Sequence, residues 1–569
     1  MVGRPPTEAT VAVRKARDFL FANPDYDKAV SGFRWPELSH FNFGLEWFDV
    51  VAAEHPDRPA VMITDGAQTG SWSYAELSRR SDQVANWLHK IGMKAGDHMI
   101  VMLPNTIELW EILLGLIKIG GVAIPTSTLL SPADLAFRAK RSRAKFAIAS
   151  NNLKRRFRGT GRSLVKIGVG PVTPPGWIDF AESHKASADY DPQALTPASA
   201  KCLLYFTSGT TSHPKLVRHT QVSYPVGHLT TMWWLGVRQG DIHLNISSPG
   251  WGKHAWSNFF APFLAQATVF VFNYERFNAA ELMHVMDEHE VTTFCAPPTV
   301  WRMLIQADLT MLQHPPRELL GAGEPLNPEV ITQVRNAWGA TIRDGFGQTE
   351  MTCAIGNNPG ALVKDGSMGR PLPGYAVTLR DPATGAEVAD EGEICLSLDA
   401  DILGLATGYY HDSALTADAY HDGYYHTGDI ARRDADGYLT YVGRADDVFK
   451  ASDYKISPFE LESILLEHPY VTEVAIVPSP DPVRLAVPKA FVKLVGDVAT
   501  NTDEAARAIF EHARERLSGY QRVRIVEFVQ DLPKTISGKI RRVELREQEA
   551  IRVANGDVDA QYLERDFRD

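Results

Sequence analysis

A hydroxyl-rich loop from Thr207 to Lys215 is the stretch of this sequence best suited to binding a polyanion. Four apolar or aromatic residues, 203–206, come directly before it and predict a short buried strand. Hydroxyl groups, backbone N–H groups beside a glycine, and one ammonium can together bind phosphate. A P-loop is excluded because the second glycine of the G-x-x-x-x-G-K-[ST] pattern is absent, and a plain surface turn is an equal alternative. The candidate ligands are Thr207, Ser208, Gly209, Thr210, Thr211 and Lys215.

A second polar turn lies at Gly345-Phe-Gly-Gln-Thr-Glu350. Its two glycines allow a tight backbone, while Thr349 and Glu350 place a hydroxyl beside a carboxylate. A hydroxyl can bond a phosphate, and a carboxylate can hold a Mg²⁺ ion that phosphates share. A polar loop without function is the alternative for this motif when it is taken alone.

Three motifs with charged residues follow nearer the C-terminus. Asp429, in Tyr425-His-Thr-Gly-Asp429, could bond both hydroxyls of a ribose, although turns favour Asp in any case. Gly443-Arg-Ala-Asp-Asp447 suits a charged hinge between two domains, or it is an exposed ion-pair cluster. Lys539, which ends the run Leu532-Pro-Lys-Thr-Ile-Ser-Gly-Lys539, could neutralise charge that develops on a phosphoryl group, or it is a surface lysine.

Alternating strands and helices must position these motifs. The first series has predicted strands at 98–103, 122–125 and 146–149, with helices at 106–119 and from Ser131. This alternation indicates a parallel sheet with crossover helices, and ligands bind such sheets at the carboxyl ends of the strands. The second series starts with the strand before the hydroxyl-rich loop and continues with a helix at 220–235, a strand at 267–272, a helix at 279–289 and a strand at 292–296.

The remaining segments are less regular in pattern. The first forty residues are predicted to be an irregular lead-in that wraps onto the body, and residues 155–200 a long surface connection. Past Arg444 a smaller α+β unit is predicted. Its elements are a capping box at Ser457 that opens a helix, strands at 471–477 and 487–495, and a helix at 503–517.

Length and composition exclude several classes of protein. A chain of 569 residues needs at least two domains, and its net charge of −11 suggests no nucleic-acid partner. Its four cysteines lie far apart without a C-x-x-C pair, which argues against a zinc site or a disulfide framework. The N-terminus has no apolar signal-peptide core, and the most apolar run, 112–125, is too short to span a bilayer. We therefore expect a cytoplasmic protein without a membrane span.

In this order, the five motifs resemble those of the adenylate-forming superfamily, which comprises acyl-CoA synthetases, nonribosomal adenylation domains and luciferases. The resemblance covers about residues 41–549. Segments 444–447, 479–483 and 528–535 are most similar to the medium-chain acyl-CoA synthetases.

The resemblance implies an α/β fold of two domains. Residues 1–443 would form a large domain of βα-type sheets plus a small barrel-like β region. Residues 444–569 would form a small mobile α+β domain that carries a hinge at Asp446 and the catalytic Lys539. The implied reaction joins a carboxylic acid to AMP with release of pyrophosphate, and then transfers the acyl group to the thiol of CoA. ATP, Mg²⁺ and CoA would be bound, and a homodimer is a possible assembly.

The resemblance also implies roles for single residues. The Thr207–Lys215 loop would hold the β- and γ-phosphates, Thr349 would bond the α-phosphate, and Glu350 would hold Mg²⁺. Gly323-Glu-Pro325 would lie along adenine. Asp429 would bind the ribose hydroxyls, and Lys539 would contact the carboxylate and the α-phosphate. The implied catalytic set is Lys539, Thr349, Glu350, Lys215 and Asp446. The implied nucleotide- or CoA-binding residues outside the loop are Gly323, Glu324, Pro325, Gln348, Asp429, Arg444, Ser452, Tyr454, Lys455 and Arg524.

Two places depart from the family pattern. Ser212-His213 stands where the family often has glycine and a variable residue. Asp453 stands where related synthetases usually carry glycine, beside the channel for the pantetheine arm of CoA, and Lys455 replaces a usual arginine. This leaves two expectations open: CoA still passes, or the acyl-adenylate is loaded onto a carrier protein or another acceptor.

The acyl pocket is expected around Trp251, Lys253 and Gly347. Gly347 stands where acetate-specific relatives place a tryptophan, which implies a longer or bulkier acid, either medium-chain or aromatic. With His254 and Trp256, the first two resemble the aromatic acyl-pocket segment of the family. Lys253 or His254 could recognise a polar substituent of the acid, or each could have a core or surface role.

Overall fold

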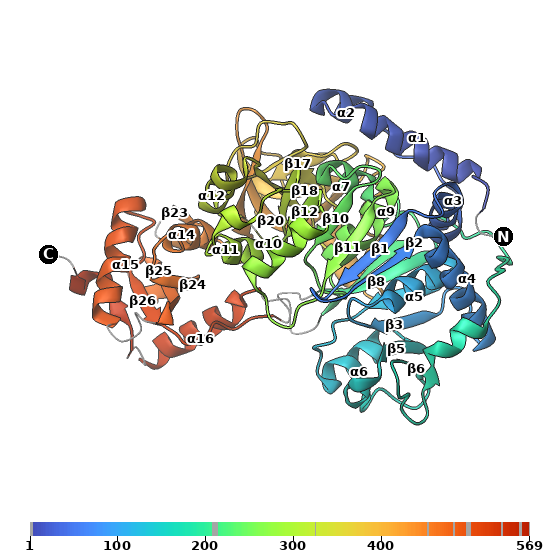
Figure 1. The fold of residues 1–569 in the computed structure, drawn as a ribbon. Helices are drawn as coiled ribbons and strands as arrows, with labels where there is room; N and C mark the ends of the chain where they lie inside the picture. The colour runs from blue at the N-terminus through green and yellow to red at the C-terminus, as the bar shows by residue number, and fades with distance from the viewer. Residues whose placement is uncertain are drawn as a thin grey trace. The chain divides into compact units, whose positions relative to one another are not determined.

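The structure, a computed structural model, describes residues 4–207, 214–324, 326–451, 454–481, 484–496, 502–535, 539–556 and 560–567. The chain forms two compact units (Figure 1), of which the first comprises Met1–Val377 and Leu396–Tyr425 and the second Thr378–Cys395 and His426–Asp569. The predicted α/β class, with a large N-terminal part and a smaller C-terminal part, is confirmed. The predicted domain boundary at 443/444 refers to the part of the chain that is expected to move as a small domain, and it stays a prediction.

A seven-stranded sheet in the first unit carries the end of the hydroxyl-rich loop. Its order is β7-β6-β5-β3-β4-β8-β9, and neighbours are parallel except for the last pair. The predicted parallel sheet is therefore confirmed. The strands are β3 (His98–Met102), β4 (Val122–Pro125), β5 (Phe146–Ser150), β6 (Val165–Val169), β7 (Ile178–Asp179), β8 (Lys201–Thr207) and β9 (Lys215–Thr220).

Crossover helices connect the strands of this sheet as predicted. Helix α5 (Ile107–Lys118) is buried from Leu109 onward and packs on α4 (Tyr74–Lys90), which explains its almost continuous apolar sequence. Helix α6 (Pro132–Arg141) begins after Ser131, whose hydroxyl accepts from the N–H of Asp134.

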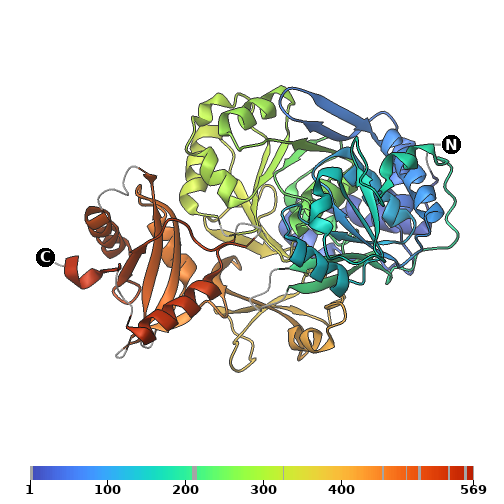
Figure 2. The same ribbon diagram turned by 90° about the horizontal axis from the view of Figure 1, so that it is seen from below.

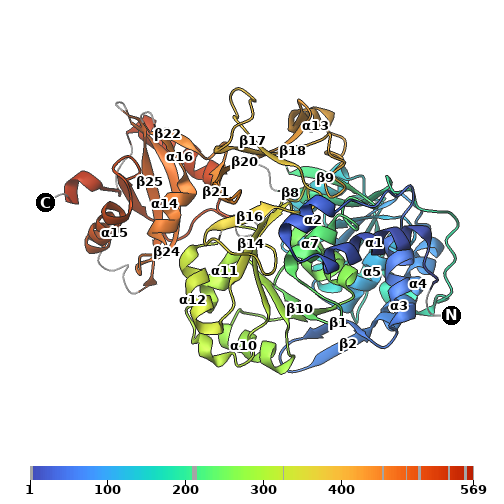
Figure 3. The ribbon, with the colours of Figure 1, turned by 90° about the horizontal axis from the view of Figure 1, so that it is seen from above.

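A second sheet in the first unit runs in the order β16-β15-β14-β13-β12-β10-β11-β1-β2. Neighbours from β1 to β14 are parallel, in keeping with a sheet covered by helices. Helices α10 (Ala279–Glu288), α11 (Pro298–Leu304) and α12 (Pro328–Trp338) cover one face (Figure 2; Figure 3) and share a core with it. The strands are β1 (Pro59–Thr64), β2 (Thr69–Ser73), β10 (Ile242–Asn245), β11 (Thr268–Phe272), β12 (Thr293–Ala296), β13 (Glu318–Ala322), β14 (Ile342–Phe346), β15 (Ile355–Gly356) and β16 (Ser367–Pro371).

The second unit combines a β part with an α+β part. In the β part β20 (Tyr424–Arg433) lies between β18 (Glu391–Ser397) and β21 (Leu439–Arg444), and β17 (Val377–Arg380) flanks β18. In the α+β part a sheet of order β24-β25-β26-β27 packs with helices around a core of its own, as predicted. Its elements are α14 (Pro458–Leu465), β24 (Val471–Asp481), β25 (Leu485–Leu494), α15 (Thr502–Arg516), β26 (Ile525–Phe528), α16 (Arg542–Asn555) and β27 (Tyr562–Leu563).

Three sequence predictions about connecting segments are wrong. The lead-in is not irregular, because Thr7 caps α1 (Glu8–Ala22) and Asp25 caps α2 (Tyr26–Gly32). The connection at 155–200 contains β6, β7 and a 3-10 turn at Phe180–Lys185. The helix predicted at 220–235 is shorter than expected: α7 (His228–Leu235) begins only at His228, because residues 221–227 form turns.

The four cysteines, Cys202, Cys295, Cys353 and Cys395, are free and buried. No helix in the described stretches has the length and apolar character needed to cross a membrane. The shorter elements are Phe43–Phe48, α3 (Asp49–Glu54), Asn151–Phe157, α8 (Gly252–Ala255), Trp256–Phe260, α9 (Ala261–Ala265), Leu309–Met311, α13 (Ser413–Ala419), β19 (Tyr420–His421), β22 (Phe449–Ala451), β23 (Tyr454–Ile456) and Glu564–Phe567.

Candidate active site

The two ends of the hydroxyl-rich loop are held together by strand pairing. Thr207, the last residue of β8, is the register partner of Lys215, the first residue of β9. The Lys215 ammonium lies 5.4 Å from the ring centre of Tyr409, a cation–π contact. The other predicted phosphate ligands, Ser208, Gly209, Thr210 and Thr211, lie outside the described residues, as does Ser212-His213.

The turn after β14 presents Glu350 in a buried and oriented position. The Tyr409 hydroxyl donates a 2.9 Å hydrogen bond to Glu350 Oε1, and the Ala406 N–H donates to the Glu350 carbonyl at 2.7 Å. Burial, together with the Glu350 charge, raises the pKa of Tyr409, so its hydroxyl keeps its proton and acts as a donor. A single tyrosine thus connects the predicted Mg²⁺ carboxylate with the predicted phosphate lysine.

A buried histidine supports Thr349 in the same turn. His219 Nε2 donates to the Thr349 carbonyl at 2.8 Å, and its other ring nitrogen lies 3.1 Å from Ser223 Oγ. Burial lowers the pKa of His219 to about 4, so the ring is neutral near pH 7. Gln348 is held as well, since its Oε1 accepts from the Tyr425 hydroxyl at 2.6 Å.

The residues after β13 leave an open surface where adenine is predicted to bind. Gly323 has a φ of +109°, which only glycine adopts readily, and a Cβ added to it would meet nothing within 4 Å. Gly323 is exposed and Glu324 half-buried. Pro325, the third residue of the predicted set, lies outside the described residues.

The predicted acyl segment lies against the turn that carries Thr349. A Cβ added to Gly252 would be 3.9 Å from Thr349 Oγ1, and one added to Gly347 would be 2.2 Å from Trp256 Cη2. The space beside Gly347 is therefore filled by an indole from another element. Trp256 is itself fixed, because its Nε1 donates to the Tyr224 hydroxyl at 2.8 Å. Trp251, the N-cap of α8, is half-buried.

Lys253 places a buried ammonium in this segment. Its Nζ atom is inaccessible to solvent, and in the part of the chain that the structure describes no oxygen accepts a hydrogen bond from it. The Cys295 sulfur interacts with the ammonium, and the charges of Asp344 and Glu324 act on it, while burial lowers its pKa. His254 is buried, and its Nε2 lies 2.9 Å from Asn105 Oδ1.

In the second unit, the predicted ribose-binding and hinge residues lie together. Asp429 is buried at the start of the β20–β21 pair, and its Oδ1 accepts from the Tyr441 hydroxyl at 3.1 Å. The Arg444 guanidinium lies 3.5 Å from Asp429 Oδ1 and 3.5 Å from Asp446 Oδ1. Arg444 thereby links the candidate ribose ligand to the candidate hinge.

Two of the remaining predicted residues of the second unit, Tyr454 and Lys455, are exposed. Lys455 is exposed on β23, and Tyr454 stacks on Tyr520 with ring centres 4.4 Å apart. The Arg524 guanidinium is bound by Glu564 and by the Gly519 carbonyl, an arrangement typical of a structural residue. Ser452 and Asp453 lie outside the described residues.

Lys539 is an exposed residue at the end of a short loop. Its N–H donates to Thr535 Oγ1 at 3.1 Å, and its carbonyl accepts from the Thr535 N–H at 2.8 Å. Among the described residues, no carboxylate forms an ion pair with its ammonium. The neighbouring Lys534, in contrast, pairs with Glu473 at 2.5 Å.

Sequence reasoning missed three supporting residues: Tyr409, His219 and Tyr441. None belongs to a recognisable motif, and each reaches its partner over 12 to 130 positions of sequence. Only a weak sequence pattern could have pointed to Tyr409 and Tyr441, namely a tyrosine near a strand that ends in an acidic turn.

Comparison with known proteins gives one consistent result. Residues 48–410 match the model of the AMP-binding enzyme family, and residues 460–539 match that of the AMP-binding enzyme C-terminal domain. The chain is 40% identical to 4-hydroxybutyrate–CoA ligase 1 of Metallosphaera sedula, over 92% of this chain and 93% of the relative. It is 35% identical to the mitochondrial acyl-coenzyme A synthetase ACSM3 of Mus musculus, over 94% and 95%.

A solved structure supports the same assignment. The anthranilate CoA ligase AuaEII in complex with anthranoyl-AMP matches with a TM-score of 0.80 at 26% identity, over 91% of this chain and 99% of that chain. The resemblance seen in the sequence is confirmed. The chain belongs to the AMP-binding enzyme family, and it is an ATP-dependent acyl-CoA synthetase, an acid–thiol ligase that acts on a carboxylic acid and CoA.

Proposed function

We propose that the enzyme activates a medium-chain or aromatic carboxylic acid as its acyl-adenylate and then forms the acyl-CoA thioester. The observation that carries this proposal is the position of the acyl segment, with Trp256 against Gly347 and Gly252 beside Thr349. Because Trp256 occupies the space beside Gly347, the tail of the acid would lie elsewhere along this segment, where the half-buried Trp251 offers an aromatic side chain to an apolar or aryl tail.

The residues present fit ATP and Mg²⁺. Gly323 leaves open backbone surface for adenine, and Glu350 is a buried carboxylate with one oxygen already oriented by Tyr409. Mg²⁺ held by Glu350 would neutralise phosphate charge. In the first half-reaction an oxygen of the acid attacks the α-phosphorus, and the bond to the bridging oxygen of pyrophosphate breaks. Lys215 and the hydroxyl-rich loop would stabilise the charge that moves onto pyrophosphate.

The second unit supplies the remaining proposed groups. Asp429, held by Tyr441 and Arg444, binds the ribose hydroxyls. Lys539 serves adenylation by neutralising charge at the α-phosphate, and a rotation about Asp446 then ends that role. In the second half-reaction the CoA thiol gives up its proton to solvent, its sulfur attacks the acyl carbon, and the bond from that carbon to the phosphate oxygen of AMP breaks.

A hydroxy acid is a second candidate substrate, because of Lys253. A buried ammonium to which no oxygen acceptor is bound in the described residues suits an oxygen on the tail of the acid. The relative that is 40% identical carries the name 4-hydroxybutyrate–CoA ligase. On this proposal, Lys253 donates to the tail hydroxyl while the carboxylate faces Thr349.

One screen tests these proposals. Carboxylate-dependent ATP–pyrophosphate exchange is measured with straight acids of two to twelve carbons, with aryl acids and with 4-hydroxybutyrate, and thioester formation is then measured with free CoA. Preference for acetate would overturn the proposed acid class. Lys253→Met should lower kcat/KM for 4-hydroxybutyrate by about 10-fold or more and spare butyrate, since a hydrogen bond to a charged group is lost. Equal loss for both acids would assign Lys253 to the protein core.

The same screen decides the acceptor. Exchange activity without a CoA thioester would favour loading of a carrier protein, the alternative that Asp453 raises. The homodimer and the cytoplasmic location stay predictions, which sedimentation and cell fractionation test.

A further inference from the structure

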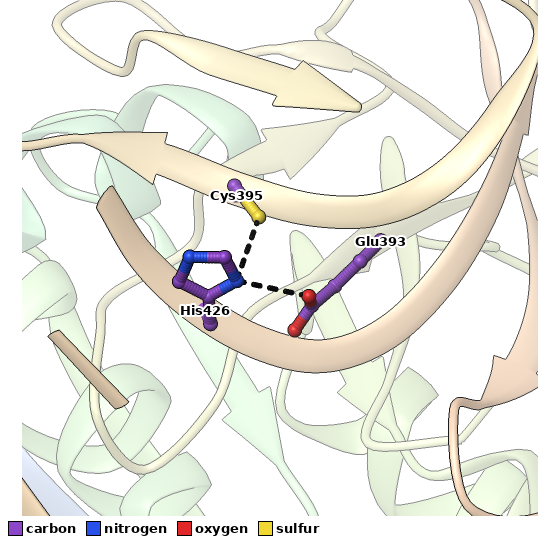
Figure 4. A group of neighbouring side chains, drawn as sticks. All are labelled: Glu393, Cys395 and His426. Carbon is purple, nitrogen blue, oxygen red and sulfur yellow. Dashed lines mark hydrogen bonds and ion pairs between the residues drawn. The ribbon is translucent and has the colours of Figure 1, made fainter. Parts of the chain in front are cut away.

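Three side chains of the second unit converge on one point, outside the residues assigned to the reaction. Glu393 and Cys395 lie on β18, and His426 lies on the neighbouring β20 (Figure 4). One ligand atom from each lies within 4.8 Å of the others. Glu393 and Cys395 are buried, and the His426 side chain is only 13% exposed. Residues two apart on β18 share a face of the strand, so the sheet itself holds this set together.

Two neighbouring side chains share one ring nitrogen of His426. Glu393 Oε2 is 2.9 Å and Cys395 Sγ is 3.5 Å from the same ring atom, His426 Nδ1. If Nδ1 carries a proton, it donates well to one of these neighbours only. If Nδ1 is unprotonated, it can accept from the thiol, but it then faces the carboxylate oxygen as a second acceptor. A cation at the centre would instead attract all three atoms.

We propose that Glu393, Cys395 and His426 form a zinc-binding site, in which a water molecule would supply the fourth ligand of the tetrahedron. Carboxylate, thiolate and imidazole are the three ligand types that Zn²⁺ takes in proteins, and this mixed set is too soft for Mg²⁺. Tetrahedral bonds of about 2.0–2.1 Å to nitrogen and 2.3 Å to sulfur place these two atoms about 3.5 Å apart, which is their present separation. The nitrogen–oxygen pair opens by about 0.4 Å to reach the roughly 3.3 Å that zinc requires.

The charges agree with a divalent cation. On binding, the Cys395 thiol releases its proton to solvent, and its thiolate and the Glu393 carboxylate together supply two negative charges. Without an ion, burial and then the Glu393 charge raise the pKa of the Cys395 thiol, against the smaller effect of Arg380 on β17, so the thiol keeps its proton until a zinc ion displaces it.

The site has a defined connection to the reaction. Glu393 Oε1 accepts from the Gly428 N–H at 2.7 Å, one residue before Asp429. An ion on Oε2 therefore fixes the carboxylate that supports the turn carrying the proposed ribose ligand. The wide spacing of the cysteines in the sequence argued against a zinc site. That argument considered only cysteine pairs, whereas the three ligands proposed here come from two strands and include a single cysteine.

Zinc titration of the full-length chain tests the proposal. The protein is stripped with a chelator, desalted and titrated with Zn²⁺ against a chromophoric zinc indicator. We expect one tightly bound zinc per chain and a higher melting temperature. Cys395→Ser and His426→Gln should each weaken binding by at least about 10-fold. Cys202→Ser, the same change at another buried cysteine, and His314→Gln, at an exposed histidine beside Asp287, should leave it unchanged.

Co²⁺ in place of Zn²⁺ gives a readout that needs no variant. Sulfur ligation by Cys395 produces a thiolate-to-cobalt charge-transfer band together with the intense visible bands of tetrahedral cobalt. The absence of that band, the absence of saturable zinc binding, or equal zinc affinity in all four variants would each overturn the proposal.

Discussion

Tyr409 and Glu350 are joined by a 2.9 Å hydrogen bond from the phenol to the carboxylate, with Lys215 over the same ring. Segments 59 positions apart are thereby linked at the point where phosphate and Mg²⁺ are proposed to bind. The carboxylate is oriented before any ligand arrives, and such preorganisation lowers the reorganisation that binding requires.

Tyr409→Phe should raise the Mg²⁺ concentration that adenylation requires. Loss of a hydrogen bond to a charged group costs about 1.5–3 kcal/mol, which corresponds to about 10- to 100-fold. The measurement is ATP–pyrophosphate exchange as a function of Mg²⁺ concentration. Tyr74→Phe is the matched control, because its hydroxyl donates to the Ala267 carbonyl away from the site. An unchanged Mg²⁺ requirement in Tyr409→Phe would contradict the assignment.

Lys539→Ala should slow adenylation by roughly 100-fold or more, on the scale of removing one preorganised charge donor. Thioester formation from supplied acyl-AMP should be spared. Lys534→Ala removes a lysine of the same loop that is paired with Glu473, so it should leave both half-reactions unchanged. Equal loss in both half-reactions of Lys539→Ala would show that this lysine has no role specific to adenylation.

Gly347→Ala should destabilise the first unit, because the added methyl would collide with the Trp256 ring and lie 2.8 Å from the Thr352 carbonyl. Overpacking of this kind costs about 1–3 kcal/mol. Trp256→Phe removes the colliding ring atoms, so the double variant should recover part of the loss. Thermal unfolding of the four proteins in a double-mutant cycle measures the coupling. Additive effects would mean that the two residues do not share this space.

The buried carboxyl group of Asp344 should make the free energy of unfolding decrease as the pH rises. Burial raises its pKa to about 7, against backbone hydrogen bonds and the Lys253 charge that lower it. The folded state therefore binds the proton more tightly than the unfolded state does. Proton binding contributes fully to the free energy of unfolding below about pH 4, and this contribution is lost as the pH rises to about 7. Asp344→Asn should gain melting temperature relative to wild type between about pH 5 and 8. A constant difference over that range would refute the prediction.

Much of the fold follows from local sequence. Continuous apolar runs bounded by turns predicted β4 residue for residue and β11 and β12 within one residue, since such strands are buried on both faces. The lead-in helices were missed because few residues of α1 are buried, among them Val13 and Leu20, so its apolar stripe is narrow.

The candidate site is harder to predict from the sequence than the fold is. Residues such as Glu350 and Asp429 stand in motifs, but the groups that orient them arrive from distant strands. The filling of the space beside Gly347 by Trp256 could not be foreseen, because it depends on how a helical turn packs against the end of β14. Spacing along the chain carries no information on such contacts.

The register pairing of Thr207 with Lys215 has a consequence for mutagenesis of the segment between them. Because strand pairing closes the loop, its length enters folding only through closure entropy, about 0.6 kcal/mol for a doubling. The closure of the loop by itself therefore adds little to the free-energy cost of a longer segment. A variant of this segment that melts like wild type but no longer exchanges pyrophosphate has lost a contact with its ligand, so binding can be studied there separately from folding.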